Sequence, residues 1–78
     1  MKLKNLEYLE ALHEYGHFGK AADACAVSQP ALSIQLKKFE EELGLKLFER
    51  SNKTVLITDE GQKISEKAQE ILQSVKEL

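Results

Sequence analysis

Apolar and polar residues alternate with a period of three to four over most of the chain, which is the period of an amphipathic helix. Within residues 5–15, Leu6, Leu9 and Leu12 recur at a three-residue spacing, and Gly16 follows as a helix stop. Side chains three or four positions apart share one face of a helix. This stretch therefore predicts a first helix that buries its leucines in a core.

A second, shorter helix of about two turns is predicted over residues 18–26. Its inward side carries small side chains: Ala21, Ala22 and Cys25. A third helix is predicted from Ser28, a good N-cap, to Gly44. Pro30 fits its first turn because the backbone N–H groups there have no helical partner. A short helix followed closely by a longer one is typical of a helix-turn-helix.

The third predicted helix has one apolar and one polar face. Its apolar positions are spaced by four, three and four residues: Leu32, Leu36, Phe39 and Leu43. At about 100° per residue, the opposite face carries Pro30, Ser33, Ile34, Lys37, Lys38 and Glu41, with Gln29 at the start. Lys37 and Lys38 fit either a solvated face or contacts with phosphates. Ile34 fits either an ordinary surface position or contact with thymine methyl groups in a major groove.

After the third helix the pattern changes to alternation, which predicts a short β-hairpin. The alternating apolar residues are Leu45, Leu47, Val55 and Ile57. Arg50 and Lys53 flank the polar tip between them. This tip fits either a wing that reaches the sugar-phosphate backbone or minor groove, or an ordinary solvated turn.

The last predicted helix covers residues 59–78, with Thr58 as its N-cap and acidic residues in its first turn. Its apolar stripe consists of Ile64, Ala68, Ile71, Leu72, Val75 and Leu78. A helix of this length extends about 30 Å, more than a three-helix core of this size requires. The stripe therefore predicts contact with a second copy, although it also fits packing on its own domain or on another part of a longer chain. Its continuation to Leu78 favours an excised piece of a longer protein.

The length and composition fit one helix-rich domain. A chain of 78 residues has few to spare for a separate catalytic cleft, and 42% hydrophobic residues with a single proline fit an ordered globule. One cysteine cannot form an internal disulfide, and there is no stretch typical of a signal peptide or a membrane span. We therefore expect a cytoplasmic protein with no membrane partner and no cofactor.

Positive charge is local rather than global. The net charge of −2 does not attract the whole chain to a polyanion. Over residues 20–39, however, three lysines (Lys20, Lys37 and Lys38) stand against Asp23 alone, while the glutamates 40–42 follow at the far end. A basic surface on an acidic chain remains compatible with nucleic-acid binding.

Residues 13–17 spell His-Glu-Tyr-Gly-His and match the zinc-peptidase pattern H-E-x-x-H. That chemistry needs both imidazoles on one helical face. Gly16 is the predicted helix stop, so His17 is expected to leave the register of His13, and no third ligand is evident. A Cys25 nucleophile needs an exposed thiolate, which the expected burial of Cys25 opposes. We therefore predict neither a metal site nor an enzyme.

Five short stretches stand in a distinctive order and spacing. They are residues 21–22, 27–33, 39–44, 47–50 and 58–61. Together they resemble the DNA-binding domain of LysR-type transcriptional regulators over essentially the whole chain. Residues 6–9, 17–18, 21–25 and 55–58 are most similar to the peroxide-sensing, OxyR-like branch of that family. The sensing cysteines of that branch belong to a regulatory domain, so Cys25 is expected to pack as a small hydrophobic residue.

The resemblance implies a mainly α fold: a winged helix-turn-helix in residues 1–58, built from a three-helix core and a hairpin wing, then a linker and dimerisation helix in residues 59–78. It implies that the first turn of the third helix enters the major groove, with Gln29 reading a base edge. The full set of predicted DNA-contacting residues, which adds Ile34 and the wing residues from the sequence pattern, is Lys20, Ser28, Gln29, Pro30, Ala31, Ser33, Ile34, Lys37, Lys38, Arg50, Ser51 and Lys53. The dimer contacts that the resemblance implies are Ile64, Ala68, Ile71, Leu72, Val75 and Leu78.

The expected function is sequence-specific binding of double-stranded DNA as a homodimer on an interrupted palindrome, within a transcriptional regulator. A second hypothesis is a protein-interaction module in which the third helix and the acidic residues 40–42 bind a protein. An enzyme is the third hypothesis. Phosphate contacts make DNA binding fall steeply with salt, so the salt dependence separates the first two.

Overall fold

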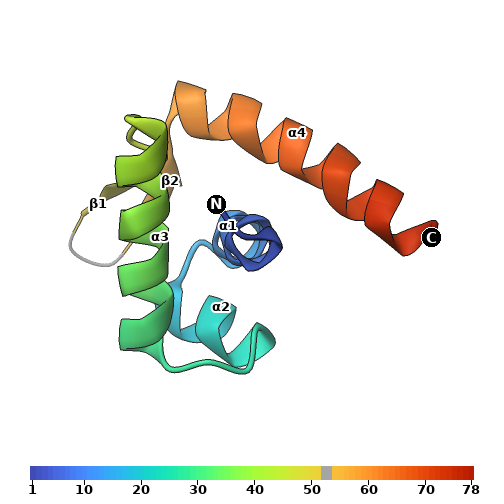
Figure 1. The fold of residues 1–78 in the computed structure, drawn as a ribbon. Helices are drawn as coiled ribbons and strands as arrows, with labels where there is room; N and C mark the ends of the chain where they lie inside the picture. Colours follow the sequence, from blue (N-terminus) through green and yellow to red (C-terminus); the bar gives the residue numbers. More distant parts are fainter. Residues whose placement is uncertain (52–53) are drawn as a thin grey trace.

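The computed structural model describes residues 1–51 and 54–78. Its elements in chain order are α1 (Leu3–Tyr15), α2 (Phe18–Ala24), α3 (Gln29–Leu43), β1 (Phe48–Arg50), β2 (Val55–Ile57) and α4 (Asp59–Lys76) (Figure 1). The two strands pair antiparallel, with Phe48 opposite Ile57 and Arg50 opposite Val55. α1 lies in the middle and packs against the other three helices (Figure 1). The predicted mainly α, winged helix-turn-helix fold is confirmed.

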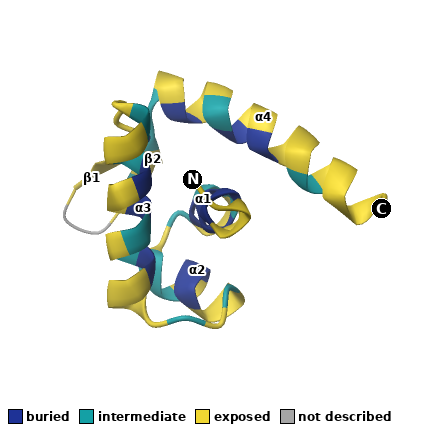
Figure 2. Ribbon diagram, viewed as in Figure 1, coloured by how far each residue is buried: buried dark blue, intermediate teal, exposed yellow. Residues whose placement is uncertain are grey.

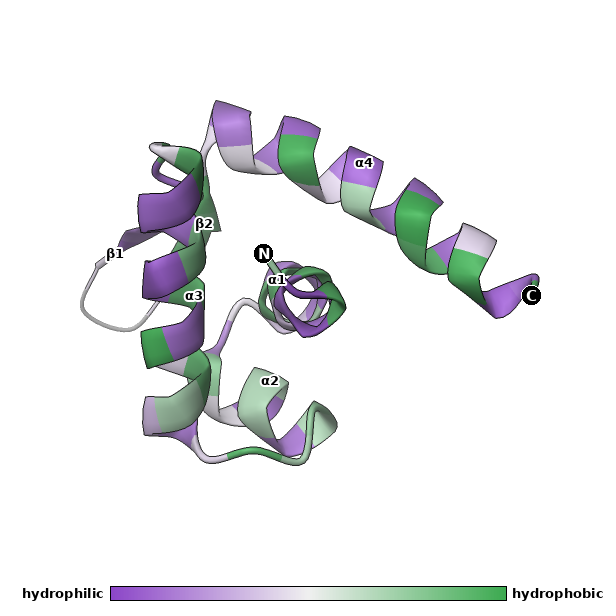
Figure 3. Ribbon diagram, viewed as in Figure 1, coloured by the Kyte–Doolittle hydropathy of each residue, from purple (hydrophilic) through white to green (hydrophobic). Residues whose placement is uncertain are grey.

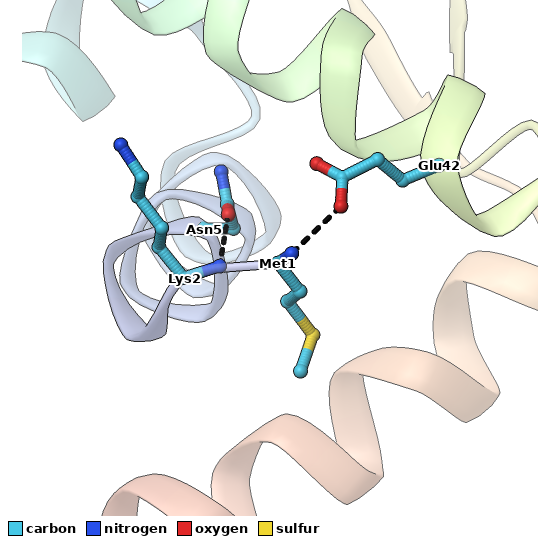
Figure 4. Close-up of polar contacts among 4 residues, drawn as sticks. All are labelled: Met1, Lys2, Asn5 and Glu42. Atoms are coloured by element: carbon cyan, nitrogen blue, oxygen red, sulfur yellow. Dashed lines mark hydrogen bonds and ion pairs between the residues drawn. The ribbon is translucent and has the colours of Figure 1, made fainter.

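α1 begins two residues earlier than predicted. The Lys2 N–H donates to Asn5 Oδ1 over 2.7 Å, and this side-chain contact closes the first turn (Figure 4). The amino group of Met1 lies 2.7 Å from Glu42 Oε2, which joins the start of α1 to the last turn of α3. At the other end, Gly16 adopts a left-handed conformation with φ 60°, so the predicted stop at this glycine is confirmed.

The turn between α2 and α3 is tighter than predicted. α2 ends at Ala24 rather than near Ala26, because Cys25 caps it and Ala26 takes a left-handed φ of 57°. The N-cap of α3 is confirmed, since Ser28 Oγ accepts the Ala31 N–H over 3.2 Å. The two helices are therefore fixed relative to each other by backbone geometry on one side and a side-chain cap on the other.

The core lies between α1 and the faces of α2, α3 and α4 that turn toward it (Figure 2). Its largest fully buried side chains are Leu9, Leu12, Leu32, Leu36, Phe39 and Leu47. Leu43, at the end of the predicted stripe of α3, is only half-buried. Cys25 is likewise half-buried, which corrects the expectation of a buried thiol.

The hairpin begins later than the alternation predicted. Leu45 is 38% exposed and lies outside the sheet, whereas Leu47 is fully buried and β1 starts at Phe48. Glu40 of α3 causes this arrangement, because its Oε2 accepts the N–H groups of Leu47 (2.7 Å) and Phe48 (3.2 Å). A helix side chain therefore fixes where the wing begins.

α4 packs against α1 through a face of small residues. Ser65 and Ala68 are buried there, and Ala68 is only 1% exposed, while Gly61 is buried in the first turn of α4 against Leu47 and Ile57. This corrects the assignment of Ala68 to the dimer interface, since it already packs within its own domain. Towards its C-terminal end α4 extends away from the core and keeps apolar residues on one side (Figure 3). No helix within residues 1–51 and 54–78 is both long and apolar enough to cross a membrane.

Candidate nucleic-acid interface

The first turn of α3 lies on the surface of the molecule. Ser28, Gln29, Pro30 and Ala31 are all exposed, and they form the end of α3 that is nearest to α2 (Figure 2). The Ser28 hydroxyl oxygen is used as the helix cap, which leaves its hydrogen available to donate to another group. Pro30 has no backbone N–H. The side-chain amide of Gln29 is therefore presented without a backbone donor at the next residue that could compete for the same partner.

The outer face of α3 continues this surface with one apolar and two cationic side chains. Ile34 is 54% exposed, and Lys37 and Lys38 are exposed one turn further on. Ser33 is half-buried, so its side chain is less accessible than the sequence predicted. The face that the sequence predicts for base contact is therefore open to a partner over at least two turns.

The wing lies beside the start of α3 and is joined to it through Phe18. A hollow between them is lined by Phe18, Gln29, Pro30, Ser33 and Arg50. Within it, Arg50 Cζ lies 4.8 Å from the centroid of the Phe18 ring, which is a cation–π contact. This contact holds the Arg50 guanidinium next to the side chain that the sequence predicts will read a base.

The described residues include only part of the tip of the wing. Ser51 is exposed and bonds to Thr54, with its N–H donating to the Thr54 carbonyl over 3.1 Å and the two hydroxyls 3.0 Å apart. Lys53, which the sequence also places at the tip, lies outside the described residues. Of the wing cations, only Arg50 is therefore placed.

Lys20 lies in the first turn of α2, next to the start of α3. Its backbone N–H donates to His17 Nδ1 over 3.1 Å, and its side chain is exposed. A Cβ on the preceding Gly19 would lie 3.8 Å from Gln29 Oε1, so the first turns of α2 and α3 are neighbours. Lys20 is therefore an exposed cation on the turn of α2 that adjoins the turn carrying Gln29.

The structure adds one residue that the sequence reasoning missed. Lys46, read from the sequence only as a spacer in the alternation, lines a hollow together with Lys37, Arg50, Glu40 and Glu49. The Glu40 carboxylate is already engaged by two backbone N–H groups. Lys46 joins the other two cations only because the hairpin folds back on α3, and the linear sequence carries no signal for that.

The profile of the family described as "Bacterial regulatory helix-turn-helix protein, lysR family" matches residues 3–62. The chain belongs to the LysR family. It is 50% identical over 76 residues to a hydrogen peroxide-inducible genes activator of Haemophilus influenzae, covering 97% of this chain and 25% of that protein. It is 49% identical over 78 residues to the DNA-binding transcriptional dual regulator OxyR of Escherichia coli (strain K12), covering 100% of this chain and 26% of that protein. The chain thus spans about a quarter of the length of these relatives.

Solved structures of LysR-family domains share the fold closely. A BenM DNA-binding domain in complex with benA site 1 DNA superposes with a TM-score of 0.94 at 40% identity, covering 99% of this chain and 86% of that chain. A DNA complex of the CbnR DNA-binding domain gives a TM-score of 0.94 at 34% identity, covering 99% and 88%. A full-length OxyR variant from Pseudomonas aeruginosa gives 0.93 at 45% identity, covering 97% and 26%. The resemblance to the LysR family and its peroxide-responsive branch is confirmed.

In this LysR-family chain, the two histidines of the H-E-x-x-H motif do not share one helix. Gly16 ends α1, and His17 becomes the N-cap of α2, so the two imidazoles lie on different helices. His13 Nδ1 instead lies 2.8 Å from Ser65 Oγ on α4. Among residues 1–51 and 54–78, no three His, Cys, Asp or Glu side chains are grouped to hold a metal ion.

Cys25 has a pKa above that of an ordinary thiol. Partial burial raises its pKa first, and the negative charge of Glu7 raises it further. The thiolate is the form that attacks peroxides and disulfides, so this position disfavours reactivity. In this LysR-family chain Cys25 serves as a packing residue at the end of α2.

Proposed function

We propose that this LysR-type helix-turn-helix domain binds double-stranded DNA sequence-specifically, as a homodimer on an interrupted palindrome, within a transcriptional regulator. The observation that carries the proposal is the exposed first turn of α3, with Gln29 beside Arg50 of the wing and Ile34 exposed further along the helix. The DNA-bound BenM and CbnR domains, which share this fold, support it.

The chemistry of this turn suits base reading. A major groove about 12 Å wide admits an α-helix, and the amide of a glutamine pairs with the two hydrogen-bonding atoms that adenine presents there. Ile34 lies almost one and a half turns further along α3 and is 54% exposed, and an aliphatic side chain suits a thymine methyl group. Gln29 therefore suits an adenine and Ile34 a thymine methyl group, each at its own position along the groove.

Cations around this turn suit the DNA backbone. Lys20, Lys37, Lys38 and Arg50 are exposed on the elements that surround Gln29, and Lys46 adds to them. The carboxylates Glu7, Glu10 and Glu14 gather elsewhere, along the groove between α1 and the end of α4. Glu49 is an exposed carboxylate in the hollow of Lys46, but cations outnumber carboxylates there, so a chain of net charge −2 can still present a locally basic face to phosphates.

The far end of α4 supports the dimer. Ile71 is 37% exposed, Val75 is 40% exposed and Leu78 is fully exposed, although all three lie on the apolar stripe. Ile64 and Leu72 are half-buried against the core of their own domain. A second copy that packs on this end of α4 would remove the exposed apolar surface from water.

Fluorescence anisotropy against a labelled duplex, measured in a salt series, tests the proposal. The logarithm of the binding constant is expected to fall linearly with the logarithm of salt concentration, by about 0.9 per phosphate contact. Lys38→Ala should lower that slope by about 1 for every sequence. Its control is Lys67→Ala on α4, which removes an exposed lysine paired with Glu70 and should leave the slope unchanged. Weak binding that ignores both salt and sequence would instead indicate the protein-interaction module.

A further inference from the structure

Ser65 of α4 lies at the centre of a polar cluster in an otherwise apolar contact with α1. Its side chain is completely buried, with 0% exposure. Its Oγ donates to Glu10 Oε1 and lies 2.8 Å from His13 Nδ1, and both partners belong to α1. We call Glu10, His13 and Ser65 the Ser65 cluster.

The hydrogen bonds of the Ser65 cluster are directional and complete. A serine hydroxyl has one hydrogen, and an ionised carboxylate can only accept, so the hydroxyl hydrogen goes to Glu10. His13 Nδ1 must then carry its own hydrogen and donate it to the Ser65 oxygen, in the neutral or the charged ring. The Ser65 hydroxyl thereby donates one hydrogen bond and accepts another at the same time. A shift of α4 along or around α1 would break both hydrogen bonds.

The other contacts between α4 and α1 cannot fix that position as sharply. Ile64, Ala68 and Leu72 pack on the core through apolar contacts, which are not directional. Gly61 holds the first turn of α4 close to Leu47 but lies at the opposite end of the helix from the exposed apolar residues. Rotation of α4 by one residue, about 100°, would carry the Ser65 hydroxyl away from Glu10 and His13 and leave both without this partner.

We propose that the Ser65 cluster fixes the rotation of α4 on α1 and so sets the separation between the two DNA-reading turns of the dimer. The proposal rests on the DNA-binding dimer proposed above. The exposed apolar end of α4 lies about 10 to 20 Å beyond Ser65 along the helix. A small change of rotation at Ser65 therefore redirects that end, and with it the second copy. Glu10, His13 and Ser65 are positioning residues for operator spacing, with no contact to DNA themselves.

The test uses duplexes that carry two inverted half-sites, obtained by selection with the unaltered chain, with zero to five base pairs inserted between them. Each inserted base pair moves the second half-site by about 3.4 Å and rotates it about the duplex. The variants are Ser65→Ala and Glu10→Ala, with Glu10→Gln as the conservative change that keeps an acceptor oxygen. Ser74→Ala is the matched control, because it makes the same substitution at an exposed position of α4.

We expect the unaltered chain and Ser74→Ala to prefer one separation over the next best by between about fivefold and a hundredfold, the range that follows from one buried hydrogen bond. Ser65→Ala and Glu10→Ala should reduce this preference to less than about threefold, and Glu10→Gln should retain most of it. Binding to a single isolated half-site should stay within about twofold in all variants, because no DNA-facing residue changes.

The spacing preference distinguishes this proposal from a merely structural role. If the Ser65 cluster only stabilised the fold, Ser65→Ala and Glu10→Ala would lower the thermal stability, and the affinity would fall by the same factor for every duplex whatever its spacing. If Ser65→Ala and Glu10→Ala bind as dimers with the unaltered spacing preference, the Ser65 cluster does not set it and the proposal is wrong. If the unaltered chain binds only as single copies, the proposed dimer fails, and this inference fails with it.

Discussion

Gly61→Ala tests how closely α4 must approach the wing. Gly61 is buried in the first turn of α4, and a Cβ there would lie 2.8 Å from Ile57 Cγ1, 3.0 Å from the Leu47 carbonyl carbon, and still nearer its oxygen. The Leu47 oxygen is backbone and already accepts the Thr58 N–H over 2.9 Å. Movement of the Ile57 side chain alone would not admit the methyl group, because the nearest atoms belong to the Leu47 backbone, so α4 itself must shift.

The expected cost follows from two opposing effects. Overpacking a tight site costs about 1 to 3 kcal/mol, and weakening the Thr58 hydrogen bond adds about 1 kcal/mol. Alanine is favoured over glycine inside a helix by about 1 kcal/mol, which offsets part of that cost. We therefore expect Gly61→Ala to lower the free energy of unfolding by about 1 to 3 kcal/mol and Tm by about 5 to 20 °C.

The assay is thermal and urea unfolding followed by circular dichroism at 222 nm. The control is Gln62→Ala at the next, exposed position of α4, which should change the free energy of unfolding by less than about 0.5 kcal/mol. A Gly61→Ala chain as stable as the unaltered one, or more stable, would show that the close approach of α4 to Leu47 is not present in solution and would refute the reasoning.

Three further predictions concern the DNA face and the thiol. Gln29→Ala should lose discrimination between selected and altered half-sites by about 1 to 3 kcal/mol in competition binding, and unchanged discrimination would remove Gln29 from base reading. Phe18→Leu should lower the affinity for all duplexes alike. Because Phe18→Leu and Arg50→Ala remove the same cation–π contact, the double variant should lose less affinity than the sum of the two single variants. Additive losses would show that Phe18 does not position Arg50. Cys25 should react with iodoacetamide at pH 8 more slowly in the folded chain than in urea, since its raised pKa disfavours the thiolate, and equal rates would contradict that shift.

The ends of α1 and α3 and the starts of α3 and α4 were predictable because single residues determine them locally. Gly16 and Gly44 adopt the left-handed conformation that ends a helix, and the hydroxyls of Ser28 and Thr58 cap the helices that follow them. These effects act over three or four residues, so the sequence displays them directly. The exposed Gln29 follows from the same local pattern.

What the sequence did not predict depends on contacts between distant residues. The wing starts at Phe48 because Glu40 accepts its N–H from α3, and Lys46 joins the other cations for the same reason. Ala68 was assigned to the dimer because a periodic stripe shows which residues share a face but not which partner covers it. Likewise, Ser65 looks like an ordinary polar residue of α4 until α1 places Glu10 beside it.

Selection of bound duplexes from a random pool tests most directly the central claim, that the first turn of α3 reads DNA in two symmetry-related copies. The predicted result is enrichment of two inverted copies of one short motif, with centres about one helical turn or a multiple of it apart. Gln29→Ala should degrade the motif without changing that separation. Recovery of sequences with no shared motif, or with a single unrepeated one, would contradict the account.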